Sequence, residues 1–194
     1  KALEIESKDK VDEDKKHKDR EIRILWTKFI ISAVFAVPLL YIAMGHMLGL
    51  PLPKALHPMD FPLRFALVQI LLTVPVVTAG YRFYTVGFKA ILHRSPNMDS
   101  LIAMGTSAAV LYSLYSTYQI SIGHFMYAED LYFETAGVII TLILLGKSLE
   151  AVSKGRTSEA IKKLMGLAPK TAIVMQAGEE IEIPIEEVEV GDII

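Results

Sequence analysis

The stretch ILWTKFIISAVFAVPLLYIAM (Ile24–Met44) decides the fold class, because it carries a single charge, Lys28, over enough residues to cross a bilayer. A hydrocarbon core of ~30 Å requires ~20 residues of helix. Soluble helices of that length usually keep a polar face. Three further stretches have the same apolar character, namely Phe65–Tyr81, Leu101–Ile122 and Leu131–Leu149. The sequence therefore predicts a mainly α-helical protein of the lipid bilayer, with four transmembrane helices arranged as two hairpins.

Composition narrows the class of function. Charged residues make up 22% of the chain and gather in the first 23 residues, in the connections and after Lys147. The net charge of −2 gives no reason to expect a nucleic-acid partner. The absence of cysteine excludes disulfides and thiolate metal sites within this chain. Residues 1–23 lack the apolar core of a signal peptide, and they suit a charged cytoplasmic linker or a charged helix end.

Basic residues predict the orientation, because lysine and arginine near the ends of spans mark the cytoplasmic side. They precede the first apolar stretch, lie between the second and third, and follow the fourth. The third connection, 121–130, has no lysine or arginine and ends with Glu129 and Asp130. The pattern predicts a multi-pass protein with both termini in the cytoplasm.

The second connection has a distinct character. Tyr81–Arg94 reads YRFYTVGFKAILHR, in which aromatic and basic residues alternate. Such a stretch prefers the membrane interface, so it is interpreted as an amphipathic helix that bends away near Gly80 or Gly87. The alternative is an aromatic belt at the end of a straight helix. With this helix, the first membrane hairpin occupies residues 24–94.

A second hairpin is expected over 95–150. It begins with SPNMD, a helix-start signal in which Ser95 or Asn97 can cap and Asp99 suits the first turn. Residues 151–194 should form a cytoplasmic stalk helix followed by two strands. The expected strands are Thr171–Met175 and Ile181–Ile185, with a turn at Ala177-Gly178. This last part is interpreted as the first strands of a β-rich domain.

Three side chains within the apolar stretches could carry chemistry. Carboxylates in a membrane are costly and suggest function, so Glu134 and Glu150 are candidates. Both could instead be interfacial acids exposed to water. Met104 offers a soft thioether that suits Cu(I). Its alternative is a core methionine that fills a gap between helices.

Three long segments, in this order, closely resemble the copper-transporting heavy-metal P-type ATPases of bacteria. They are SPNMDSLIAMGTSAAVLYSLY (Ser95–Tyr115), YFETAGVIITLILLGKSLE (Tyr132–Glu150) and SEAIKKLMGLAPKTAIV (Ser158–Val174). The resemblance covers residues 22 to 194. It implies that the first two helices are those peculiar to heavy-metal pumps, that the next two belong to the common core, and that residues after about 151 lead into the actuator domain.

The resemblance also implies roles for individual residues. Met104 and Glu150 match the ligands at which Cu(I) enters the pump, and Glu134 matches a glutamate on the exit path. The aromatic and basic helix would be a docking platform for a copper chaperone or for the pump's own N-terminal metal-binding domain. Its platform residues are Tyr81, Arg82, Lys89 and Arg94, and its hinge candidates are Gly80 and Gly87.

Other parts of the resembled pumps are missing from this sequence. It has no CPC motif, no TGE loop, no phosphorylated aspartate motif and no nucleotide-binding domain, so no catalytic residue is expected here. ATP and Mg²⁺ would act only in the complete protein. We therefore expect an N-terminal portion of an ATP-driven Cu(I) exporter of the bacterial plasma membrane, inactive without the remainder of the pump. The alternatives are a pump for Ag(I) or another soft metal, and a non-enzymatic four-helix membrane scaffold.

Overall fold

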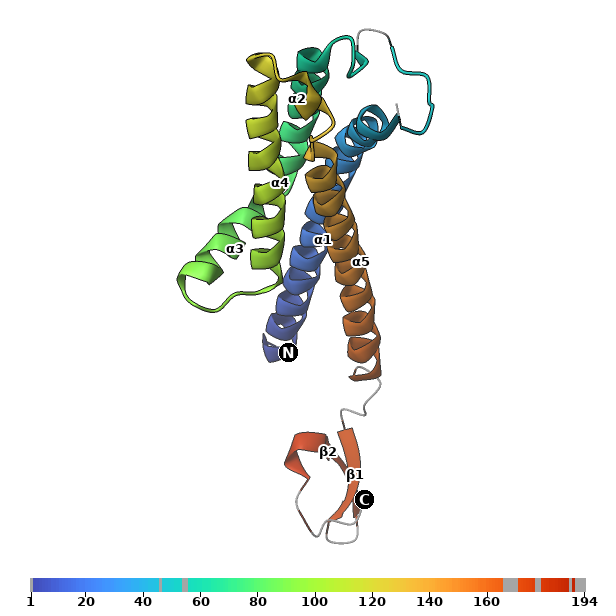
Figure 1. Cartoon of the computed structure of the whole chain (residues 1–194). Coiled ribbons are helices and arrows are strands. Elements are labelled where there is room, and N and C mark those ends of the chain that lie inside the picture. Colours follow the sequence, from blue (N-terminus) through green and yellow to red (C-terminus); the bar gives the residue numbers. More distant parts are fainter. Residues whose placement is uncertain are drawn as a thin grey trace. The chain divides into compact units, whose positions relative to one another are not determined.

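The computed structural model describes residues 2–45, 47–53, 56–165, 171–176, 179–188 and 190, and it divides into two compact units, Lys1–Val152 and Ser153–Ile194. The first unit is helical (Figure 1). Its elements, in chain order, are α1 (Ala2–Gly45), α2 (Pro62–Ala79), α3 (Tyr81–Leu92), α4 (Met98–Ser121), the short 3-10 helix η2 (Phe125–Ala128) and the part of α5 (Phe133–Met165) up to Val152.

Three segments of the described chain are long and apolar enough to cross a membrane. They are Lys16–Gly45, Pro62–Ala79 and Phe125–Gly155. The prediction of four spans is therefore supported only in part, because α4 is not among them. Serine, threonine and tyrosine recur along α4 and lower its hydropathy, although it has 24 residues and only Asp99 as a charge.

Helix α1 joins the charged N-terminal stretch to the first apolar stretch without a break. The charged stretch is thus the beginning of a helix, one of the two forms that its composition suits. Pro38 lies inside α1 and Pro75 inside α2, and both helices continue past these residues. The break between α2 and α3 falls at Gly80, where the chain turns away from the axis of α2 (Figure 1).

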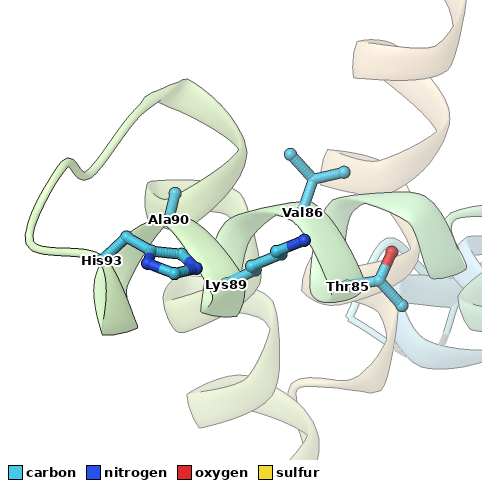
Figure 2. Close-up of a pocket in the computed structure, with 5 residues that line it drawn as sticks. All are labelled: Thr85, Val86, Lys89, Ala90 and His93. Atoms are coloured by element: carbon cyan, nitrogen blue, oxygen red, sulfur yellow. The ribbon is translucent and has the colours of Figure 1, made fainter.

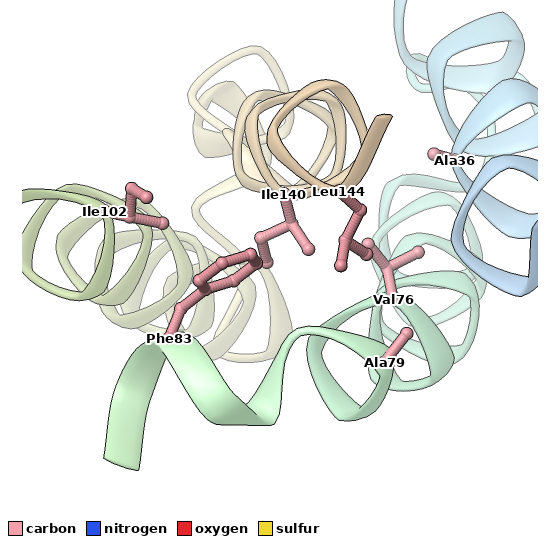
Figure 3. Close-up of a cluster of buried hydrophobic side chains, with 7 residues drawn as sticks. All are labelled: Ala36, Val76, Ala79, Phe83, Ile102, Ile140 and Leu144. Atoms are coloured by element: carbon pink, nitrogen blue, oxygen red, sulfur yellow. The ribbon is translucent and has the colours of Figure 1, made fainter. Parts of the chain in front are cut away.

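One apolar cluster brings together all five helices. Phe83 reaches from α3 toward Ile140 of α5, while Val76 and Ala79 approach from α2 (Figure 3). A Cβ atom on Gly80 would lie 2.6 Å from the Ile140 side chain, so the break between α2 and α3 is pressed against α5. The complete cluster comprises Ala36, Val76, Ala79, Phe83, Ile102, Ile140 and Leu144.

A second cluster lies around η2 and the start of α5. It joins α1 and α2 to the last turn of α4, and its members are Leu39, Phe65, Ala66, Ile120, Ala128, Leu131 and Phe133. Beside the first cluster, the hydroxyls of Ser32 in α1 and Thr141 in α5 lie 2.7 Å apart in a buried hydrogen bond. The helices are therefore fixed by apolar packing at two levels, with a polar contact between α1 and α5.

Most buried hydroxyls bond to their own helix. Thr106, Ser113 and Thr117 of α4 each donate to the carbonyl four residues earlier, at 2.7–2.8 Å. Such bonds satisfy the polar group where no water is available. Ser113 also accepts a 2.7 Å hydrogen bond from the backbone N–H of Tyr132, which ties α4 to the chain just before α5.

The second unit contains an antiparallel hairpin of β1 (Thr171–Gln176) and β2 (Glu179–Pro184), followed by the 3-10 turn η3 (Ile185–Glu187). Thr171 pairs with Pro184 and Gln176 with Glu179. Both predicted strands are present, although β2 begins two residues earlier than expected and ends before Ile185. The predicted turn at 177–178 lies outside the described residues.

Candidate functional site

The start of α4 is fixed by its own sequence. Asn97 accepts a 3.0 Å hydrogen bond from the Ser100 backbone N–H, and the Ser100 hydroxyl accepts one of 3.1 Å from the Asn97 N–H. This reciprocal capping box satisfies donors that a helix start leaves unpaired. Asp99 lies in the first turn, where a negative charge complements the helix dipole. The structure thus gives Asp99 a defined position.

Met104 lies on an exposed face of α4. Its side chain is 56% exposed, and the neighbouring Leu101 is 73% exposed. A Cβ atom on Gly105 would meet no described atom within 4 Å. Met104 therefore does not fill a gap between the helices of the described chain. Its thioether is available to a soft ion or to a neighbouring helix.

Helix α5 is joined to the start of α4 by an ion pair. The Lys147 ammonium donates to the Asp99 carboxylate at 2.7 Å, with the two side chains 30% and 17% exposed. The same ammonium lies 5.1 Å from the centre of the Phe83 ring of α3. The Ser100 hydroxyl donates to the Gly87 carbonyl of α3 at 2.9 Å. Three helices therefore meet at this point.

Glu150 and Met104 lie on opposite sides of this ion pair along the helix axes. Met104 follows Asp99 by five residues in α4, and Glu150 follows Lys147 by three in α5, which runs in the opposite sense (Figure 1). At 1.5 Å per residue, their backbones differ by about 12 Å in level. Side chains tilt toward the N-terminus of their helix, so these two lean toward each other. Both are exposed in the described chain.

Glu134 lies in the first turn of α5, far from the other two candidates. Its Oε1 atom accepts a 3.0 Å hydrogen bond from the Thr135 hydroxyl. Its Oε2 atom is buried and has no hydrogen-bond partner within the described chain. Glu134 is thus half-buried, unlike the exposed Glu150. The structure places the two glutamates at opposite ends of the apolar part of one helix.

The outer face of α3 carries a row of polar side chains. Thr85, Lys89 and His93 recur every four residues and, with Val86 and Ala90, line a shallow hollow (Figure 2). The remaining platform candidates Tyr81, Arg82 and Arg94 are also exposed. The Lys28 ammonium of α1 lies 4.8 Å from the Tyr81 ring, which ties the start of α3 to α1. Gly87 faces the other way, toward α4.

Sequence reasoning did not identify the polar row on α3 or the ion pair of Lys147 with Asp99. The four-residue spacing of Thr85, Lys89 and His93 was a visible signal for the outer face of α3. Lys147 was a signal too, because a lysine at the edge of an apolar stretch needs a partner. Among the described residues, no group of three or more histidine, aspartate or glutamate side chains is placed to hold a metal ion.

Comparison with known proteins gives a consistent result. No protein-family model matches the chain. It is 42% identical over 194 residues to the copper-exporting P-type ATPase of Bacillus subtilis, covering all of this chain and 24% of that protein. It is 40% identical over 190 residues to the "Probable copper-importing P-type ATPase A" of Enterococcus hirae, covering 96% of this chain and 24% of that protein. Over 174 residues it is 40% identical to a copper-transporting ATPase of Helicobacter pylori, covering 86% of this chain and 23% of that protein.

The chain thus spans about a quarter of the length of the curated relatives that it matches. Several such relatives, each matched along most of this chain, confirm the resemblance expected from the three quoted segments. The helices and the hairpin described above belong to that shared part of the sequence. The chain therefore belongs to the family of heavy-metal P-type ATPases.

Proposed function

We propose that this chain forms the part of an ATP-driven Cu(I) exporter through which the ion enters the membrane. The observation that carries this proposal is the 42% identity, over all 194 residues, to a protein named as a copper exporter. ATP hydrolysis with Mg²⁺ belongs to the complete protein in this proposal. The direction of transport is part of the proposal, since another relative is named as an importer.

In this proposal Met104 and Glu150 receive the ion at the cytoplasmic end. A thioether and a carboxylate suit a transient Cu(I) site, because each is a weak enough ligand to pass the ion on toward the membrane interior. The exposure of both side chains supports this role, since helices from the rest of the pump can approach them. Glu134 then assists release at the opposite end, where its buried Oε2 atom offers a free acceptor.

We also propose that α4 spans the membrane as the third of four membrane helices, in a plasma-membrane protein with both termini in the cytoplasm. The bonds of the Thr106, Ser113 and Thr117 hydroxyls to the α4 backbone support this, because these three groups then need no water as a partner. The basic outer face of α3 then lies on the cytoplasmic side. Its Lys89 and His93 suit an acidic surface on a copper chaperone or on an N-terminal metal-binding domain.

The test is Cu(I)-stimulated ATP hydrolysis by the full-length protein that carries this chain. We expect Met104→Leu and Glu150→Ala to abolish the stimulation. Met126→Leu is the matched control, because Met126 is 89% exposed in η2 and has no proposed role. Wild-type turnover in both variants would refute the ligand assignment. Stimulation by Ag(I) alone would favour the silver pump, and a wild-type protein without any metal-stimulated hydrolysis would favour the scaffold.

A further inference from the structure

The Asp99–Lys147 ion pair lies between the two residues that receive the ion in the proposed function. We propose that Asp99 sets the affinity for Cu(I) at the cytoplasmic mouth, because its carboxylate neutralises Lys147 beside Glu150. This inference rests on the proposed function of Met104 and Glu150. Asp99 acts here through Lys147 and is a positioning residue, since it need not touch the ion.

Lys147 lies close enough to Glu150 for its charge to matter. The two residues are three apart in α5, a spacing at which side chains of a helix are neighbours, with Cβ atoms about 5–6 Å apart. An unneutralised ammonium at this distance would repel an incoming cation and compete with it for the Glu150 carboxylate. The 2.7 Å bond to Asp99 directs the Lys147 side chain toward α4 and cancels its charge.

The structure holds Asp99 firmly in the position that this role requires. Its backbone belongs to the capped first turn of α4, and the adjacent Ser100 hydroxyl bonds to the Gly87 carbonyl. The Asp99 carbonyl carbon and oxygen lie within 2.8 Å of the point where a Cβ atom on Gly87 would lie. The Phe83 ring also faces the Lys147 ammonium. The lysine therefore has an anion and an aromatic ring as partners on this side.

A purely structural ion pair and an electrostatic one predict different results. If the pair only held α4 against α5, removing either partner would weaken Cu(I) binding. If the pair sets the local charge, Asp99→Asn leaves a net positive charge and Lys147→Met leaves a net negative one. The two substitutions should then shift the affinity for the cation in opposite directions, and the double variant should return toward wild type.

The experiment compares Asp99→Asn, Lys147→Met and the double variant in the full-length protein. Cu(I) affinity is measured by competition with a Cu(I) chelator, together with KM and kcat of Cu(I)-stimulated ATP hydrolysis. We expect Asp99→Asn to raise the Kd and KM roughly three- to tenfold, in the range of a partly buried charge pair. Lys147→Met should lower the Kd and KM, with kcat within about twofold of wild type in both variants.

Glu129→Gln, which removes an exposed carboxylate near η2, is the control for a general change of charge. Equal losses of affinity in both single variants, with no recovery in the double variant, would overturn the proposal. If a single variant does not fold, the double variant with the reversed pair, Asp99→Lys with Lys147→Asp, replaces it. A Cu(I) affinity of this reversed variant that differs from wild type would also overturn the proposal. A wild-type protein without Cu(I) stimulation would instead refute the proposed function.

Discussion

Replacing Gly87 by alanine should loosen the contact between α3 and α4, although alanine favours a helix more than glycine does. The new Cβ atom would overlap the Asp99 carbonyl oxygen and would lie 2.9 Å from the Ala103 Cβ atom. The first neighbour is backbone, so no rotation of a side chain can relieve the contact. Overpacking of this kind costs about 1–3 kcal/mol. The gain in helix propensity is about 1 kcal/mol.

The backbone contact places Gly87→Ala near the upper end of the overpacking range, so the net loss of stability should be about 2 kcal/mol. Gly105→Ala is the matched control, because it gives the same gain in propensity and its Cβ atom would meet nothing within 4 Å. The assay is thermal unfolding of the full-length protein in detergent, read by intrinsic fluorescence. We expect Gly87→Ala to unfold several degrees below wild type, and Gly105→Ala to unfold at or above the wild-type temperature. Equal midpoints for the two variants would refute this packing argument.

Two further substitutions test contacts of the helical unit. Ser113→Ala should destabilise the protein by about 1–3 kcal/mol, because the part-buried N–H of Tyr132 loses its acceptor. Ser121→Ala, which removes an exposed hydroxyl, is the control and should change the stability little. The thermal unfolding midpoints of the two variants are compared, and equal midpoints would contradict the argument. Lys89→Glu should weaken binding of a negatively charged copper-loaded metal-binding domain, and most strongly at low salt, since exposed charges are screened at high ionic strength. Titrations at two salt concentrations measure this effect, and affinities that match wild type at both would show that Lys89 takes no part in docking.

The sequence predicted membrane helices clearly where a long stretch was also strongly apolar. Its prediction was ambiguous where a stretch was long enough to cross a membrane but contained many polar residues. α1, α2 and α5 could be found from hydropathy because their apolar stretches hold few polar residues. α4 could be found as a helix from the SPNMD signal, and its capping box confirms that start. The proposal that α4 spans the membrane is supported by the Thr106, Ser113 and Thr117 hydroxyls, which bond to the helix itself. That compensation is a feature of the folded chain, which a hydropathy average does not contain.

Contacts between distant residues could not be predicted from the pattern. Asp99 and Lys147 are 48 residues apart, and Ser32 and Thr141 are 109 apart. Nothing in local periodicity specifies which helix faces which, because that choice is made by the fit of whole surfaces. The same reason explains Gly87, which the sequence suggested as a hinge candidate. In the structure it lies within α3, where the backbone of α3 closely approaches α4.

The self-bonded hydroxyls of α4 also bear on how the chain is made. A nascent helix leaves the translocon before all of its final neighbours have been synthesised, so its surface first meets lipid. If α4 spans the bilayer as proposed, the Thr106 and Thr117 hydroxyls already have acceptors within their own helix, whereas the buried Ser116 hydroxyl has no partner within the described chain. Helices that arrive later could then pack on its exposed face without first having to supply partners for the Thr106 and Thr117 hydroxyls.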